Sequence, residues 1–231
     1  GKKIKTVTQL TKQGMSFVFN RITGEPVWPI EEKPVPQSTV PGERSAPTQP
    51  FPTKPAPYVP LGYSENGLIN FTADLRKEAI KIAEQYVRGP IYTPPTRVEE
   101  NGTKGTWVQP GYGGGSNWNG GAFDVETGFM FVPTRNNAMI SRLTEADPSL
   151  TDWDYIRATT MSADGPQGLP IVRPPWSKVT ATDMNKGEHM WWRSIGSARQ
   201  GPGSRSGRIG HRFHRRRIQH QPSTTSRRRR T

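Results

Sequence analysis

The chain has 231 residues, of which 31% are hydrophobic, and it contains 24 Gly and 23 Pro. This length suffices for one domain, and so much Gly and Pro favours short strands and long loops over a helical bundle. The absence of Cys excludes disulfides and thiolate metal sites. No apolar run is long enough for a membrane-spanning helix. The opening GKKIKTVTQL has neither an initiator Met nor a signal-peptide core, so we expect the sequence to begin inside a longer chain.

Positive charge is concentrated at the C-terminal end. The formal net charge is +13, and Ser197 to Thr231 contains eleven Arg and no acidic residue. Subtracting these eleven charges leaves +2 for residues 1–196, which is an ordinary balance. Few apolar residues occur in the tail, so we expect residues 197–231 to be disordered. A nucleic-acid-binding arm is one interpretation of the tail, and an out-of-frame translation of a GC-rich gene is the other, which we favour.

The first predicted elements are two strands joined by a turn. Residues 2–10 alternate weakly, and Met15 to Phe19 is rich in residues that favour strands. The turn between them contains Lys12. Taken by itself, a Lys in such a turn is usually a solvated surface charge.

A proline-rich segment and one helix follow. Residues 25–60 are dense in Pro, which fixes φ and removes a backbone donor, so we expect a long loop with little regular structure. Its apolar residues favour an ordered loop over a linker, and we expect Trp28 to pack between sheets. From Thr72 to Val87 the pattern predicts the one helix, with Thr72 as N-cap and Gly89-Pro90 beyond its end.

The central stretch, residues 111–135, predicts a β-hairpin preceded by a glycine-rich loop. A glycine cluster and Asn117-Trp118 precede two strands that flank the turn Asp124 to Gly128. Residues 136–163 are polar and predict an irregular loop. Asp147, Asp152 and Asp154 lack the spacing of a calcium-binding loop. His189, the one His before the tail, has no neighbouring residues that would make a catalytic constellation.

A hairpin pattern recurs along the chain. Each copy has a strand ending in Asn or Asp, a few turn residues, a Gly and a second strand, with the Gly at positions 24, 128 and 187. Such repetition is typical of β-propeller blades. The alternative is that these are three unrelated hairpins, because an Asx turn closed by Gly is common.

Several long segments, in order, resemble one family. They are TKQGMSFVFNRITGEPVWPIEEKPVPQSTVPGE, PTQPFPTKP, GGGSNWNGGAFDVETGFMFVP and GLPIVRPPWSKVTATDMNKGEHMW. They resemble the pyrroloquinoline-quinone (PQQ)-dependent dehydrogenases, in particular the membrane-bound glucose dehydrogenase branch, from Gly1 to about Gly196. The resemblance implies an all-β fold: a partial eight-bladed β-propeller of about three blades with one inserted helix and long Pro-rich loops. Residues 1–196 would be this propeller part and residues 197–231 the Arg-rich tail.

The resemblance also assigns roles to three residues. Lys12 matches the family's cation beside the reactive quinone carbonyl, where a fixed charge stabilises negative charge on oxygen. Asn117-Trp118 resembles an Asn-Trp pair whose Asn contacts the quinone, although the glucose branch varies at the Asn position. The alternatives are that Asn117 caps a turn and that Trp118 is part of the hydrophobic core.

The function implied by this resemblance is oxidation of a sugar or alcohol hydroxyl, with electrons passed to a quinone or cytochrome. The family acts in the periplasm or on the periplasmic side of the inner membrane. Its catalytic Asp, its calcium ligands and the Trp under the ring would precede Gly1, so we expect no metal ligand in this chain. We therefore expect the chain to be inactive without the missing propeller blades. A nucleic-acid-binding protein that uses the Arg tail is the alternative.

Overall fold

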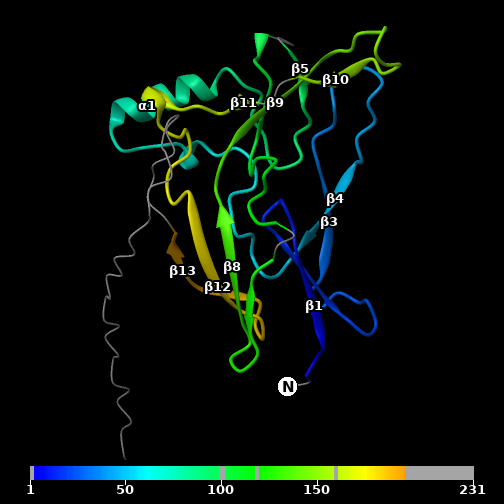
Figure 1. Cartoon of the computed structure of the whole chain (residues 1–231), viewed down its shortest axis with the longest axis vertical. Helices are drawn as coiled ribbons and strands as arrows, with labels where there is room; N and C mark the ends of the chain where they lie inside the picture. The colour runs from blue at the N-terminus through cyan, green and yellow to red at the C-terminus, as the bar shows by residue number, and fades with distance from the viewer. Residues whose placement is uncertain (1–2, 99–101, 118–119, 159–160, 196–231) are drawn as a thin grey trace, which may run out of the picture. The chain divides into compact units, whose positions relative to one another are not determined.

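The computed structural model describes residues 3–98, 102–117, 120–158 and 161–195, which lie in one unit of the chain. This part consists mainly of short strands (Figure 1), with one α-helix, α1 (Ala73–Ala83), and the 3-10 helices η1 (Glu65–Gly67) and η3 (Pro166–Gly168). The strands are β1 (Thr6–Leu10), β2 (Ser16–Asn20), β3 (Ile30–Pro34), β4 (Thr48–Pro52), β5 (Thr96–Arg97), β6 (Thr106–Val108), β7 (Ala122–Asp124), β8 (Phe129–Arg135), β9 (Met139–Glu145), β10 (Tyr155–Arg157), β11 (Met161–Ser162), β12 (Ser177–Asp183) and β13 (Glu188–Ser194).

The three hairpin turns predicted from the repeated pattern have the same hydrogen bonds. Each turn begins at an Asn or Asp. The side-chain oxygen of that residue accepts a hydrogen bond from the backbone N–H two residues later, and its backbone carbonyl accepts one from the N–H of the Gly. The Gly φ angles are 77°, 75° and 68°, in the left-handed region that favours Gly. The residue pairs are Asn20 and Gly24, Asp124 and Gly128, and Asp183 and Gly187.

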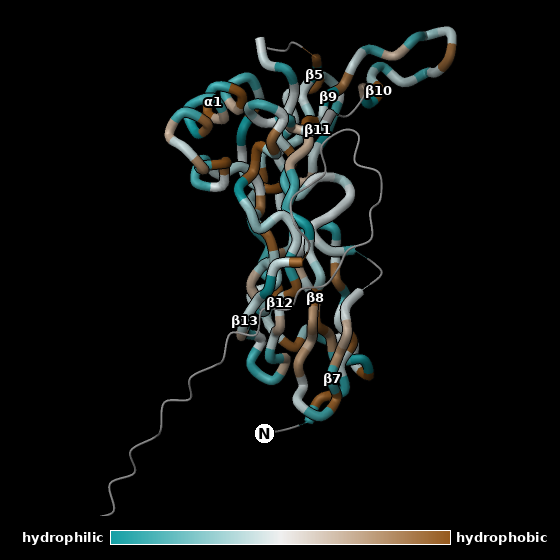
Figure 2. The backbone as a smooth tube through the Cα atoms, turned by 60° about the vertical axis from the view of Figure 1, so that its left-hand side comes forward, coloured by the Kyte–Doolittle hydropathy of each residue, from teal (hydrophilic) through white to brown (hydrophobic). Residues whose placement is uncertain are grey.

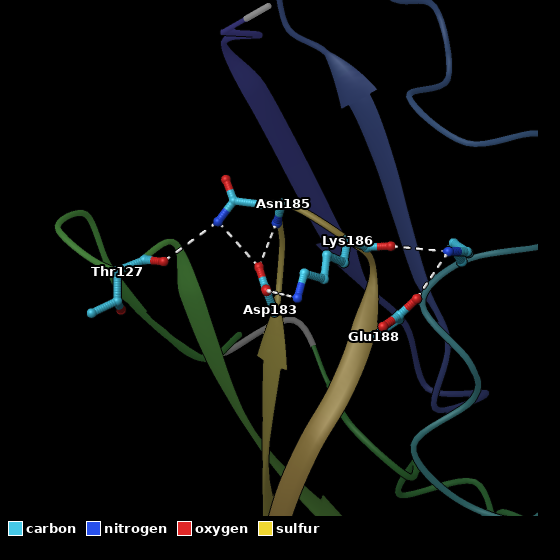
Figure 3. Close-up of polar contacts among 6 residues, drawn as sticks. Thr127, Asp183, Asn185, Lys186 and Glu188 are labelled. Carbon is cyan, nitrogen blue, oxygen red and sulfur yellow. Dashed lines mark hydrogen bonds and ion pairs between the residues drawn. The ribbon is translucent and has the colours of Figure 1, made fainter. Parts of the chain in front are cut away.

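The second and third hairpins meet at their turns. Figure 3 shows Asn185 between Asp183, which accepts from its amide at 3.1 Å, and the carbonyl of Thr127, which accepts at 3.4 Å. A Cβ at Gly128 would lie 2.6 Å from Asn185 Nδ2, so a side chain there would displace the Asn185 amide, and the φ of 75° itself favours Gly. The two turns therefore fix each other.

The two hairpins form a single sheet. β8 pairs with β12 over seven residues, and the strand order is β13-β12-β8-β7, antiparallel throughout. β8, β12 and β13 lie side by side in Figure 1. The sequence interpretation of each hairpin as a separate blade is therefore wrong for this pair. Joining them buries one face, since Val132, Thr180 and Thr182 are at most 1% exposed.

A second sheet is centred on β9, within residues 136–163, where the sequence predicted an irregular loop. β9 pairs with β10, β11, β6 and β5. Ile140 and Ser141 are fully buried in its middle. The strand was missed because its sequence, MISRLTE, is mostly polar, and its burial depends on four partner strands, of which β5 and β6 lie far earlier in the chain.

The predicted helix is confirmed, but it is shorter than expected. The Thr72 side chain accepts from the Leu75 N–H at 3.1 Å, as an N-cap does. After Ala83 the helix ends, because Val87 instead pairs with Thr106. In Figure 2, α1 alternates between hydrophilic and hydrophobic stretches. Its buried residues, Ala79 and Ala83, pack in a core shared with β6 and β9.

The proline-rich segment is more regular than predicted. β3 and β4 pair as an antiparallel two-stranded sheet in this segment. Pro is tolerated there because each strand has a free edge. Tyr58, at 1% exposed, anchors the end of the segment in the core beneath β8. Trp28 packs against the β12–β13 turn, since a Cβ at Gly187 would lie 2.9 Å from its ring.

Candidate functional site

Lys12 lies in the tight turn between β1 and β2. The Gly14 N–H donates to the Thr11 carbonyl at 2.9 Å, and Gly14 has a φ of 76°. The Lys12 side chain is exposed. Within the described ranges, no carboxylate or carbonyl pairs with its ammonium group. The cation is therefore available to a ligand.

The glycine-rich loop packs directly on this turn, although the two are separated by 105 residues in the sequence. The Gly115 N–H donates to the Lys12 carbonyl at 2.8 Å, and the Ser116 hydroxyl donates to the Thr11 carbonyl at 2.7 Å. A Cβ at Gly114 would lie 3.0 Å from both Cα and Cγ of Lys12. The Gly cluster is thus needed for close approach, and it fixes the backbone that carries Lys12.

Asn117 stabilises its own loop. Its amide donates to the Gly113 carbonyl at 3.1 Å, and its backbone carbonyl accepts from the Gly120 N–H at 3.0 Å. This geometry agrees with the turn-capping alternative, and a contact with a quinone stays a prediction. The position predicted for Trp118 lies outside the described residues.

A cavity of about 600 Å³ opens beside Lys12. Its wall is contributed by the β1–β2 turn, the proline-rich segment, the loop that precedes β5, strand β6 and the end of β10. Lys12 and Arg157 are the two cations in this wall, and no Asp or Glu occurs among its described residues. This volume is in the usual range of small-molecule sites.

Arg157 is held beside the cavity by an aromatic ring. Its guanidinium lies 5.7 Å from the ring centre of Tyr112. The Tyr112 hydroxyl is hydrogen-bonded to Ser141, which is fully buried on β9. Since a guanidinium stacks well on aromatic faces, the Tyr112 ring favours this position of the exposed Arg157 side chain.

A buried amide forms the inner wall of the cavity. Gln109 is 5% exposed, accepts from the Trp107 indole N–H at 3.1 Å and donates to the Asn136 side chain at 2.7 Å. Gln109, Tyr112 and Arg157 were not predicted from the sequence, because none stands in a recognisable motif. These residues come together because β6, which precedes Gln109 and Tyr112, and β10, which carries Arg157, both pair with β9.

His189 has a structural role in this geometry. Its Nε2 donates to the Ala56 carbonyl at 2.8 Å, and its Nδ1 lies 3.0 Å from the Thr182 hydroxyl. Tyr58 packs on the ring at 4.6 Å between centres. Burial lowers the pKa of His189 and raises that of Tyr58. The neutral imidazole therefore ties the proline-rich segment to β12, in keeping with the interpretation that His189 is not catalytic.

The family is decided by comparison with known proteins. Residues 1–217 match the family model described as PQQ: glucose/ethanol/alcohol dehydrogenase, β-propeller domain. The chain belongs to this family. Its sheets are accordingly part of a β-propeller, and the expected fold class is confirmed.

Curated relatives of the chain are dehydrogenases. It is 28% identical to the glycerol dehydrogenase large subunit of Gluconobacter thailandicus, with 86% of the chain and 30% of that protein covered. It is 29% identical to quinoprotein glucose dehydrogenase A of Acinetobacter calcoaceticus, with 86% and 26% covered. It is 26% identical to the quinate/shikimate dehydrogenase (quinone) of Acinetobacter baylyi, with 81% and 25% covered. The chain thus spans 30% or less of the length of these relatives.

The side chains beside the cavity suit the cofactor that this family implies. PQQ combines a quinone with carboxylate groups, so a site that fits it supplies cations on a backbone that is held firmly in place. The Lys12 ammonium meets the first need, and the backbone beneath it is fixed by Gly114 and Gly115. Lys12 is the residue of this chain that would hold the quinone end.

Calcium has no evident ligands in the described ranges, where no group of three or more His, Cys, Asp or Glu residues could hold a metal ion. The Asp147 carboxylate instead accepts from the backbone and hydroxyl of Ser149, which lower its pKa. This agrees with the interpretation of residues 147–154 as a loop. None of the helices in the described part is long and apolar enough to cross a membrane.

Proposed function

We propose that this chain is part of a PQQ-dependent dehydrogenase that oxidises a hydroxyl group of a sugar or alcohol. The observation that supports this most is the family match over residues 1–217, which includes both the Lys12 turn and the glycine-rich loop packed on it. The relatives named for glycerol and glucose support the substrate class. Electrons would pass to a quinone or cytochrome acceptor.

Lys12 is proposed to act as the electrostatic partner of the cofactor. When bound, PQQ supplies a quinone that accepts two electrons from the substrate's alcohol carbon. The Lys12 ammonium would stabilise negative charge on a carbonyl oxygen of the bound quinone, as a fixed cation does. Lys12 suits this role because its ammonium has no acidic partner in the described ranges and its backbone is held by the Gly115 and Ser116 contacts.

Asn117 and Trp118 are proposed as the further cofactor contacts of this chain. An amide can donate to a quinone carbonyl while its oxygen accepts elsewhere. Asn117 is supported by its place on the loop that packs on Lys12, and Trp118 by its motif alone. If Asn117 has only a loop-capping role, its substitution would lower stability and cofactor affinity together.

The remaining expectations also stand as proposals. Calcium would be held by residues outside this chain, other propeller blades would complete the site, and the protein would act in the periplasm or facing it. Residues 197–231 would be an Arg-rich tail, of which the family match covers residues 197–217. The nucleic-acid alternative is not adopted, because the relatives are dehydrogenases.

A titration of the purified chain with PQQ, followed by quenching of Trp fluorescence, tests the role of Lys12. We expect Lys12→Gln to weaken binding about tenfold or more, since a charge-assisted contact contributes about 1.5–3 kcal/mol. Lys12→Arg should retain most of the affinity. Lys77→Gln is the matched control, because Lys77 is an exposed cation on α1 and outside the cavity wall.

Two results would refute the proposal. One is PQQ binding that is unchanged in a folded Lys12→Gln chain. The other is equal loss of affinity in Lys12→Gln and Lys77→Gln, which would mean that PQQ binds through overall positive charge. Circular dichroism of each variant shows whether it retains the fold.

A further inference from the structure

One wall of the cavity beside Lys12 comes from a hairpin that does not share a sheet with the other strands. In the described part of the chain, β3 and β4 pair only with each other. A two-stranded hairpin is marginally stable by itself, so its position depends on what holds it to the rest of the fold. On this side the cavity is lined by residues of the hairpin and its loop, namely Val35, Pro36, Ser45, Ala46 and Gln49.

The base of the hairpin is anchored. The Thr53 N–H and hydroxyl both donate to the Pro29 carbonyl, at 3.0 Å and 2.8 Å, and these bonds close the base. The Lys54 ammonium donates to the Lys186 carbonyl at 3.1 Å, which ties the base to the β12–β13 turn. The hairpin can therefore move only about this end.

An aromatic pair joins the hairpin to another part of the cavity wall. The Phe51 ring on β4 meets the Tyr92 ring edge to face, with ring centres 5.7 Å apart. Lys33 on β3 lies over the Phe51 ring, 5.5 Å from its centre. Tyr92 lines the cavity from the loop that precedes β5 and is half-buried, whereas Phe51 lies outside the wall. The Phe51–Tyr92 pair thus connects two segments that form different sides of the cavity.

Tyr92 has a backbone conformation that its residue type disfavours. It is the third residue of the turn from Pro90 to Thr93, which the Thr93 N–H closes by donating to the Pro90 carbonyl at 3.2 Å. Its φ is 69°, in the left-handed region, where such a turn normally has Gly or Asn. Strain of this kind persists only where the surrounding structure holds it, and it is common in segments that clamp or switch.

The strain is confined to the middle of the turn. Pro90 bridges to Gly62, and the Pro94 carbonyl accepts from the Thr106 hydroxyl at 3.0 Å, so both flanks are fixed. The cost of a left-handed Tyr and the stabilisation from an aromatic pair are similar in size. The turn with the Phe51 contact and a relaxed turn without it therefore lie close in free energy.

We propose that the β3–β4 hairpin is a lid on the cavity beside Lys12, and that the Phe51–Tyr92 pair is its latch. Loss of the pair opens the lid, because the hairpin then swings about its anchored base. With the latch formed, the lid limits the entry of water and ligands to the cavity. This lid belongs to the free chain and goes beyond the proposed dehydrogenase function.

The absence of Cys from the chain makes a specific labelling experiment possible. Val108→Cys places one thiol in the cavity wall, at a half-buried position on β6. The rate at which iodoacetamide alkylates this thiol, followed by mass spectrometry, measures how often the cavity is open. In this background Phe51→Ala should raise the rate about three- to tenfold, the factor that an aromatic pair contributes. Tyr92→Gly should raise it similarly, and Tyr92→Phe should keep the original rate because the ring remains.

Two comparisons distinguish a latch from a general loss of structure. Combining Phe51→Ala with Tyr92→Gly should add little to either change alone, since both remove the same contact. Phe71→Ala is the matched control, because it removes an edge-to-face pair with Trp176, and neither residue lies in the cavity wall. Its rate should equal that of the background chain.

Three results would overturn the lid. The first is an unchanged rate in folded Phe51→Ala, since a rise in Tyr92→Gly alone would reflect only its smaller side chain. The second is an equal rise in Phe71→Ala. The third is a rate that follows the fraction of unfolded chain in urea, which would mean that labelling requires global unfolding. None of these measurements includes PQQ, so they decide the lid whether or not the proposed function holds.

Discussion

Gly114 offers the sharpest test of how the candidate site is built. Its φ is 90°, and a Cβ there would lie 2.4 Å from the Ser116 carbonyl oxygen and 3.0 Å from Lys12 Cα. Replacement by Ala therefore adds backbone strain, about 1–2 kcal/mol, and a steric overlap that costs about 1–3 kcal/mol. We expect Gly114→Ala to lower the free energy of unfolding by about 2–5 kcal/mol in total.

The neighbouring residue supplies the control. A Cβ added at Gly113 would meet no heavy atom within 4 Å, and the φ of Gly113 is not positive. Gly113→Ala should therefore change stability by less than about 1 kcal/mol, and it can stabilise the fold by restricting the unfolded chain.

Urea unfolding of both variants, followed by Trp fluorescence, measures the difference. We also expect Gly114→Ala to weaken PQQ binding, because relief of the overlap displaces the Lys12 turn. Equal stability of the two Ala variants would show that the glycine loop does not pack on Lys12 as described. If Gly114→Ala lowers stability and leaves PQQ affinity unchanged, the packing of the glycine-rich loop on the Lys12 turn does not contribute to cofactor binding.

Two further predictions concern buried polar groups. Burial lowers the pKa of His189 from its ordinary value of 6.5, so the unfolded chain binds a proton first as the pH falls. Stability that is present above pH 6.5 should therefore decline as the pH drops below that value, and His189→Gln should flatten this slope in urea unfolding between pH 8 and pH 5. A slope that is the same in both proteins would contradict this role. Gln109→Leu should cost about 2–4 kcal/mol, since it leaves the Trp107 and Asn136 polar groups without their partner. Gln37→Leu, at an exposed position, should be nearly neutral, and equal effects of the two changes would show that Gln109 is not buried.

The chain's local features were predictable from sequence. Each hairpin turn needs an Asx residue and a Gly four positions later, and both are visible in the sequence. The N-cap of α1 was equally evident in Thr72. The position of Lys12 in a turn followed from the strands around it, but its role came from resemblance to a family.

Long-range features were not predictable in the same way. β9 has a polar sequence and becomes a central strand because four strands pair with it. The same limit explains the missed cavity wall, since Arg157 reaches Tyr112 only through the pairing of β10 and β6 with β9. Joining the second and third hairpins likewise depends on β8 and β12 burying a shared face.

The sequence by itself determined the turns, the helix start and the family, because these depend on residues close together in the chain or on long ordered motifs. Tertiary structure alone decided which hairpins share a sheet, that the glycine loop holds the Lys12 turn, and that Arg157 and Lys12 line one cavity. The physical reason is that backbone preferences act over a few residues. Burial and strand pairing instead join segments as far apart as Lys12 and Gly115, and many such pairings satisfy the same local pattern.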